Sequence, residues 1–386
     1  MYHSTSLLLL PFIAFLLICH ANPLSGQSLA FRYQSGRVVQ TNPDVVNLDI
    51  GERRLTRFTS YHLEMHWQTI GKEEWTQRFN YPAYGLGIKL GDFSMKDKLG
   101  LPMSLYGHFS SCFVRRQRLE FYYEFHLGLT FNWKSFEEGV NEYYAASGSK
   151  TSVYIAPGIG LRYRINDFVK IASGLSIVHF SNAATRLPNR GINIITPSFQ
   201  MIFSRSNDLP DFQHRQWEPF RAKNEWLIST FWGQKHRPFR QTEERPKLAP
   251  YEQEYFSQYG LQLTFNRHFR YSSKIGIGVD FTIDNAIRTK YSVEESEARG
   301  EQIPVNHKVA ISIYPSYELQ VNKTSFFLQP GLYLLRKKTT YANPVFYQRV
   351  GMRHLLKRQF FLGVNVRAYR FHVADFIEWT IGYKLT

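Results

Sequence analysis

A histidine and a serine stand two residues apart near the middle of the chain, and together they carry the groups needed for acyl transfer. His179 and Ser181 end an alternating apolar run, and after a short polar link a second alternating run begins at Asn193. In a β-strand, residues i and i+2 point to the same face and lie roughly 7 Å apart. A general base beside a hydroxyl is the minimum equipment for nucleophilic attack on an ester. The chemistry open to the pair therefore depends on the strand and the face that carry it.

The first 21 residues are typical of a secretory signal. The apolar run Leu7–Cys19 has the length of a signal core, and Ala21 offers a small residue for cleavage. An uncleaved anchor is the alternative, but the run is short for a membrane span. After cleavage the formal net charge is still +16, which could attract nucleic acid or an anionic membrane, and export without a nucleic-acid motif favours the membrane. Cys112 is then the only cysteine, which excludes an internal disulfide.

Period-two alternation recurs along the exported chain and predicts membrane-crossing strands. From Leu119 to Trp133, and again from Lys274 and from Lys308, apolar or aromatic side chains occupy every second position. These runs are longer than the roughly 5–6 residues of strands in soluble sandwiches, and long enough to cross a bilayer at a tilt. Aromatic residues make up 16% of the chain. We predict an all-β, antiparallel transmembrane β-barrel rather than a soluble β-protein.

About sixteen such runs can be counted, an even number as bacterial barrels have. They fall at 29–39, 56–69, 80–90, 102–113, 118–133, 151–164, 168–180, 192–204, 224–233, 255–266, 270–283, 307–320, 324–335, 343–354, 358–371 and 373–385. The first and ninth runs alternate least clearly, so twelve or fourteen strands stay open. The long link near the middle predicts a barrel half at 22–205, a linker at 206–223 and additional strands at 224–386.

The alternation also predicts which way the pair points. His179 and Ser181 continue the side of the run that carries Leu175 and Ile177, which should face lipid. Asn193 opens the matching face of the next run. With both termini in the periplasm, the link between the two runs lies outside the cell. The three polar side chains are therefore expected together on the lipid-facing wall near the outer leaflet, where polar groups are costly unless they are partnered or functional.

Two short segments at this link resemble the motif of the lipid A 3-O-deacylase (PagL-type) family of outer-membrane barrel enzymes. The segments are His179–Ala183 and Pro188–Ile192, which match His-x-Ser-Asn and Pro-Asn-x-Gly-Ile at the family's spacing. The resemblance covers the chain to about residue 205 and leaves 224–386 unexplained. It implies that the first half is like an eight-stranded deacylase barrel. The alternative is that these residues are ordinary turn formers in the headgroup zone.

The resemblance implies a role for each matching residue. Ser181 would be the nucleophile and His179 its general base. The residues implied in oxyanion stabilisation or substrate binding are Asn182, Ala183, Ala184 and Asn189. Arg186 and Arg190 could contact lipid A phosphates, or they could be snorkelling or solvated loop charges.

The chain departs from the family at the last residue of the motif, where Asn193 stands in place of a catalytic glutamate. An amide can orient the imidazole but does not add the charge that stabilises its protonated form. An asparagine is nevertheless the third member in Cys-His-Asn proteases. No acidic residue lies between Phe168 and Asn207. A carboxylate could instead come from the preceding outer loop, with Glu142 as the first candidate and Glu138 as the second.

These observations predict an outer-membrane esterase that removes an ester-linked acyl chain from lipid A, lipopolysaccharide or another outer-leaflet lipid. Two alternatives stay open at this point: a catalytically inactive barrel that binds lipid, and a channel or transporter with an aqueous lumen. No metal, no cofactor and no nucleic-acid partner is expected. The sequence indicates neither the oligomeric state nor the role of residues 224–386.

Overall fold

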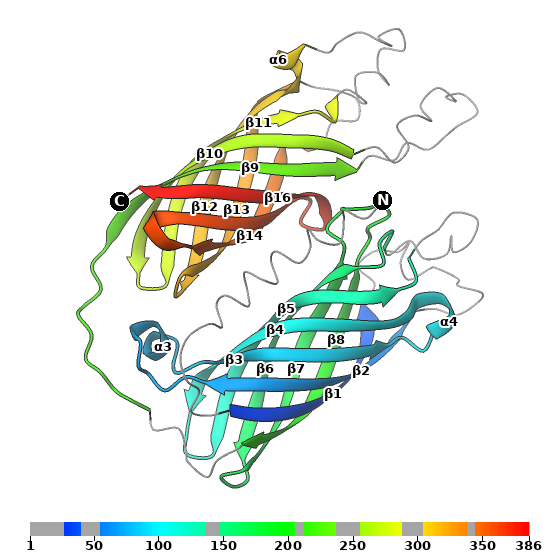
Figure 1. The fold of residues 1–386 in the computed structure, drawn as a ribbon, viewed down its shortest axis with the longest axis vertical. Helices are drawn as coiled ribbons and strands as arrows, with labels where there is room; N and C mark the ends of the chain where they lie inside the picture. The colour runs from blue at the N-terminus through cyan, green and yellow to red at the C-terminus, as the bar shows by residue number, and fades with distance from the viewer. Residues whose placement is uncertain are drawn as a thin grey trace. The chain divides into compact units, whose positions relative to one another are not determined.

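The computed structural model describes residues 27–39, 55–135, 147–204, 212–236, 255–287, 304–337 and 344–385. Within these ranges sixteen antiparallel strands form two closed barrels of eight (Figure 1). The predicted fold class and strand number are thus confirmed, and each predicted run overlaps one strand. What the alternation did not reveal is that the strands close as two separate barrels. The chain divides into two compact units, 1–182 with 188–218 and 183–187 with 219–386.

The first barrel closes where its first strand pairs with its eighth. Its strands are β1 (Gln27–Val39), β2 (Arg57–Gln68), β3 (Ala83–Asp92), β4 (Gly100–Arg115), β5 (Leu119–Trp133), β6 (Ser152–Arg164), β7 (Val169–Ser181) and β8 (Ile192–Ser204). Two short helices, α3 (Glu74–Arg78) and α4 (Lys96–Leu99), lie in its connections.

The second barrel closes where β16 pairs with β9. Its strands are β9 (Lys223–His236), β10 (Tyr255–Arg270), β11 (Ser273–Asp284), β12 (Val309–Val321), β13 (Thr324–Arg336), β14 (Phe346–Leu355), β15 (Phe360–Tyr369) and β16 (Val373–Leu385). Its connections include the short helices α6 (Val305–Lys308) and η2 (Lys357–Gln359). None of the helices in the described ranges is long and apolar enough to span a membrane.

Both barrels carry apolar side chains outward and polar ones inward. In the first, Leu63 and Ile159 are about half exposed on the outer wall, and in the second Ile275 and Ile277 are similarly placed. Such an outward apolar band is the surface that a barrel presents to lipid. Alternate residues of the same strands point inward and are buried, which is what period-two patterning dictates.

Each interior is filled by ion-paired side chains. In the first barrel the Arg32 guanidinium binds Glu124 with two hydrogen bonds of 2.5 and 2.8 Å and lies 3.1 Å from Glu64. In the second, Arg349 lies 2.5 Å from Asp280 and 2.7 Å from Glu378, and all three are buried. Eight strands leave room for little more than side chains. The wide aqueous lumen that sixteen strands in one barrel could enclose is therefore not formed by the described strands.

A cluster of aromatic rings fills one end of the first barrel, directly behind the end of β7. Phe180 points inward between His179 and Ser181 and packs against Trp133 and Tyr154, at centroid separations of 5.4 and 5.6 Å. The buried ammonium of Lys89 lies over the Phe58, Tyr154 and Phe180 rings at 4.2–4.8 Å. This packing holds the end of β7 from the inside and leaves its outer face to the polar pair.

Candidate active site

His179 and Asn193 face each other directly across the β7–β8 pair. The Nδ1 of His179 lies 2.7 Å from Oδ1 of Asn193, so the imidazole donates its Nδ1 hydrogen to the amide oxygen. A neutral imidazole carries one hydrogen, and placing it on Nδ1 leaves a lone pair on Nε2. Asn193 therefore holds the histidine in the tautomer that a general base needs.

Ser181 is the last residue of β7 and lies on the same outward face as His179. Both side chains are half-buried, whereas Leu175 and Ile177 on the same face are about half exposed. This is the placement that the alternation predicted. The Ser181 hydroxyl donates a hydrogen bond of 3.1 Å to Oδ1 of Asn189. A base, a hydroxyl and two amides thus gather where the apolar wall of the barrel ends.

The orientation of Asn189 differs from the expectation that it stabilises an oxyanion. Its Oδ1 accepts from the Ser181 hydroxyl and also from the backbone N–H of Asn182, at 3.0 Å. An isolated bridge to Ser147 holds the Asn189 backbone. Turning the amide over would set its NH2 group against the Asn182 N–H, so the observed orientation is fixed. Asn189 therefore presents an acceptor to Ser181, where an oxyanion requires a donor.

Asn182 is buried beneath the link rather than exposed to a substrate. Its side chain is fully buried, and its Nδ2 donates to the Ser147 hydroxyl at 3.3 Å. The two following residues, Ala183 and Ala184, are buried and adopt left-handed backbone conformations with φ of 51° and 60°. Left-handed conformations are uncommon for alanine and occur preferentially at functional sites.

Gly191, the glycine of the Pro188–Ile192 motif segment, determines the space around the histidine. Its φ is +64°, and a Cβ built on it would lie 3.1 Å from Cε1 and 3.8 Å from Nε2 of His179. Any larger residue would crowd the side of the ring that carries the free lone pair. The Gly in the Pro188–Ile192 segment was visible in the sequence, but only the folded link shows what it faces.

The described residues contain no carboxylate that replaces the missing acid. Asp167 is the only acidic residue in 147–204, and it lies in the β6–β7 turn at the opposite end of β7. Glu138 and Glu142, the predicted substitutes, lie outside the described residues. Of the two predicted phosphate contacts, Arg186 is exposed and Arg190 is half-buried.

Two family models match the chain, one for each barrel. Residues 59–201, from β2 into β8, match the model described as lipid A 3-O-deacylase (PagL). Residues 224–386 match the model described as acyloxyacyl hydrolase, C-terminal domain. Each barrel thus matches a model of the PagL family. The likeness of the chain to the family extends beyond residue 205, because the second half corresponds to a C-terminal domain of the same family.

Among solved structures, the chain is similar to the outer membrane enzyme PagL, at 15% identity over 44% of this chain and 97% of that one, with a TM-score of 0.30. It is also similar to a mutant of the Rh. blastica porin, at 6% identity over 94% and 100% of the two chains and a TM-score of 0.17. The Ralstonia pickettii toluene transporter TbuX matches at 9% identity over 93% and 89%, with a TM-score of 0.18. No curated protein matches.

The matches to the PagL models, together with closed barrels that carry apolar outer walls, indicate an outer-membrane protein. The region matched to the deacylase model includes the His179, Ser181 and Asn193 arrangement. In this chain, the residue that faces the histidine across the strand pair is the amide Asn193.

One group of side chains in the described ranges has metal-ligand character, but it lies inside the first barrel and apart from the pair. Ligand atoms of Glu64, His66 and His108 lie within 4.8 Å of one another. The Glu64 carboxylate already accepts hydrogen bonds from the Tyr106 hydroxyl at 2.6 Å and the Gln200 amide at 2.5 Å. It also pairs with Arg32. These contacts fit a hydrogen-bonded barrel interior.

Proposed function

We propose that the chain is an outer-membrane esterase that removes an ester-linked acyl chain from lipid A or another lipid of the outer leaflet. The observation that carries this proposal is the hydrogen bond of 2.7 Å by which Asn193 orients His179, on the outward face that also carries Ser181. The match of residues 59–201 to the lipid A 3-O-deacylase model supports the same reaction class. An ester at the membrane boundary meets this face of the barrel without leaving the bilayer.

In the proposed mechanism, His179 and Ser181 act on the ester in two steps. Nε2 of His179 takes the Ser181 hydroxyl proton as Oγ bonds to the ester carbonyl carbon. The tetrahedral intermediate collapses, the sugar oxygen leaves with the proton from His179, and the acyl chain remains on Ser181. Water then attacks the acyl-enzyme with the same base, which releases a fatty acid and restores the hydroxyl.

The backbone at Ala183 and Ala184 is the proposed source of oxyanion donors. Asn189 presents its oxygen to Ser181, so we propose backbone N–H groups as the donors. The family resemblance assigns this role to amides around these two alanines, and their left-handed conformations support a functional reason for the strained link. Backbone N–H groups aimed at a developing oxyanion are among the strongest contributions to acyl-transfer catalysis.

The surroundings of the pair suit a lipid with an anionic head. Leu175 and Ile177 offer apolar contact to the acyl chain on the side of the membrane core. Arg186 and Arg190 follow Ser181 in the link and are proposed to bind phosphate groups of the headgroup, which guanidinium groups bind with paired hydrogen bonds. Gly191 leaves the approach to Nε2 of His179 open.

Mass spectrometry of lipid A tests the proposal. Outer membranes that contain the intact chain should lose one acyl chain from lipid A and release the matching fatty acid. Ser181→Ala should abolish the loss. Ser173→Ala is the matched control, because Ser173 lies on the same outward face of β7 and should leave activity unchanged. Unchanged lipid A with the intact, folded chain would defeat the hydrolase proposal for this substrate and favour an inactive lipid-binding barrel.

The maturation of the chain is part of the same proposal. We propose cleavage of the signal after residue 21, followed by two barrel segments at 22–205 and 224–386 joined by a linker at 206–223. The apolar core of residues 7–19 supports export. Sequencing the amino terminus of protein recovered from outer membranes tests this point, and a terminus at Met1 would show that the segment is retained.

A further inference from the structure

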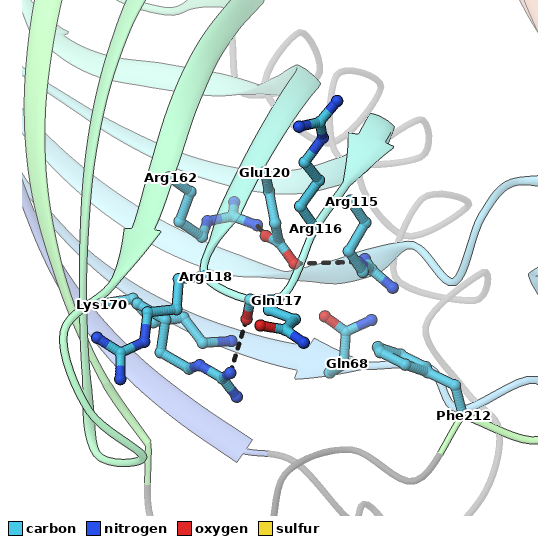
Figure 2. A pocket seen from close by; sticks show the side chains of 10 residues that line it. Gln68, Arg115, Arg116, Gln117, Arg118, Glu120, Arg162, Lys170 and Phe212 are labelled. Carbon is cyan, nitrogen blue, oxygen red and sulfur yellow. Dashed lines mark hydrogen bonds and ion pairs between the residues drawn. The ribbon is translucent and has the colours of Figure 1, made fainter.

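The first barrel has a second polar feature at the end opposite the candidate active site. A cavity of about 340 Å³ opens there between the β4–β5 turn, the end of β6 and the start of β7 (Figure 2). Lys170 and Ser181 stand at opposite ends of β7, which corresponds to roughly 36 Å along the strand at about 3.3 Å per residue. The cavity is therefore separate from the site proposed for deacylation.

The lining of this cavity is strongly basic. We call it the basic mouth, and its six cations are Arg115, Arg116, Arg118, Arg162, Arg164 and Lys170. Glu120 is the only carboxylate in the lining. Six like charges around one small space repel one another unless anions accompany them.

Glu120 does not neutralise the basic mouth, because two arginines already use its charge. Its Oε1 lies 3.0 Å from Nε of Arg115, and its Oε2 lies 2.8 Å from Nη1 of Arg162. Figure 2 shows both guanidinium groups turned toward this carboxylate. Among the described residues, Arg116, Arg118 and Lys170 form no ion pair within 4 Å.

Two buried donors in the basic mouth are left without an acceptor. Nε of Arg162 and Nη1 of Arg115 are shielded from solvent and make no hydrogen bond among the described residues. The Arg162 side chain is only 8% exposed. Buried donors of this kind are normally satisfied, so their state points to an acceptor that binds in the cavity.

The two inner arginines are held in place before any ligand binds. The Arg115 guanidinium lies 4.5 Å from the centre of the Phe212 ring and donates to the Tyr81 carbonyl at 3.3 Å. Arg162 lies 4.4 Å from the centre of the Tyr122 ring. Fixed guanidinium groups lose little freedom on binding and match the paired oxygens of a phosphate. The exposed cations at the rim add charge that can adapt.

The neighbouring surface places the basic mouth at a membrane boundary. Phe113, Leu119, Ile165 and Phe168, which flank the lining residues in the sequence, are each about half exposed. Large apolar side chains beside arginines and a lysine are typical of the zone where acyl chains meet headgroups. A phosphate group in that zone lies within reach of the cavity.

We propose that the basic mouth is a binding site for a phosphate-bearing anion, supplied either by a phospholipid headgroup or by free phosphate or pyrophosphate. The inference is independent of the proposed esterase activity. It requires only the first barrel and does not involve His179 or Ser181.

The test uses the full-length chain in nanodiscs, with two probes that separate the sources. Pyrophosphate is titrated calorimetrically into nanodiscs of phosphatidylcholine. Retained phosphatidylglycerol is counted by native mass spectrometry after release from nanodiscs that contain both lipids. The test variant is Arg118→Gln/Lys170→Gln. The control is Arg37→Gln/Arg57→Gln, which removes the same charge from two exposed residues that pair at the other end of β1 and β2.

We expect the test variant to weaken the binding of at least one probe by about tenfold or more, because charge-assisted hydrogen bonds to phosphate are lost. The control should change it less than about twofold, which distinguishes a site from bulk attraction. Loss of phosphatidylglycerol alone identifies a headgroup site, and loss of pyrophosphate alone identifies a free-phosphate site. Equal losses in the test and control variants, or no binding of either probe, would overturn the proposal. Arg118→Lys/Lys170→Arg should retain binding, which guards against misfolding as the cause.

Discussion

Replacing Asn193 by aspartate is expected to accelerate deacylation, because it adds a negative charge beside a histidine that becomes positive in the reaction. Oδ1 of Asn193 accepts from Nδ1 of His179 at 2.7 Å. Aspartate has the same length as asparagine, so a carboxylate oxygen can take the same position without moving β8. Glutamate is one methylene longer and would need an adjustment of the strand pair.

The size of the effect follows from the charge separation. Two unit charges about 4 Å apart attract by ~4 kcal/mol at an effective dielectric constant of about 20. The half-buried position of residue 193 reduces this gain, because a carboxylate there is partly dehydrated before the reaction begins. We expect the transition state to gain about 1.4–2.7 kcal/mol, which is roughly a ten- to hundredfold faster reaction.

The assay is the initial rate of fatty-acid release from purified lipopolysaccharide, measured by mass spectrometry at equal amounts of folded enzyme. Asn193→Leu is the matched variant that removes the acceptor, and it should slow release by about a hundredfold or more because the imidazole loses its tautomer and orientation. A folded Asn193→Asp enzyme that is no faster than the parent would refute the assignment of Asn193 as the partner of His179. If Glu142→Gln loses activity while Asn193→Asp changes it little, the carboxylate that stabilises the imidazolium would instead be Glu142, in the loop before β6.

Three further substitutions follow from the contacts. Gly191→Ala should slow deacylation by about a hundredfold, since a Cβ 3.1 Å from Cε1 of His179 displaces the ring, and a rate near the parent's would contradict that reasoning. Lys89→Met should leave the free energy of unfolding unchanged or raise it by about 1 kcal/mol, because it removes a buried charge that has no hydrogen bond. Urea unfolding in lipid measures this free energy. A clear decrease would show that the aromatic rings stabilise the ammonium by more than its burial costs. Arg349→Met should lower the free energy of unfolding by about 3–5 kcal/mol in the same assay, because Asp280 and Glu378 each lose a cationic partner. A change below about 1 kcal/mol would show that Arg367 alone can neutralise both carboxylates.

Strand positions were accessible from the sequence because alternation is a local property. The run predicted at 192–204 is β8 without any change of bounds. The run at 151–164 differs from β6 by one residue at its start, and the run at 168–180 is shifted from β7 by one residue. Barrel closure is not local, since it depends on which edge strands pair. The sequence offers one signal that could have separated the barrels, namely the bulky inward residues. Tyr106, Tyr154 and Tyr314 fill narrow interiors and would suit a wide aqueous lumen poorly.

The site divides in the same way between local and non-local features. The pairing of His179 with Asn193 follows from a hairpin whose two runs have matching faces, and the register bears it out. The orientation of Asn189 and the space left by Gly191 depend on left-handed residues and bridges in the link, which alternation does not encode. The basic mouth was missed for a related reason. Its cations come from the β4–β5 turn and from the ends of β4, β6 and β7, which become neighbours only when β4 to β7 are side by side.

An amide at position 193 is consistent with the demands of the outer wall as well as with those of catalysis. Two hydrogen bonds join polar groups of this face, since His179 donates to Asn193 and Ser181 donates to Asn189. The neutral, hydrogen-bonded His179–Asn193 pair has a low desolvation cost on a lipid-facing strand. A carboxylate at position 193 would have to be partly dehydrated there. Under the proposed mechanism, the amide would give His179 the orientation that a base needs without that cost. In the transition state it lacks the charge that would stabilise the imidazolium. Under this proposal, Asn193 stabilises the unreacted site at the expense of reaction rate.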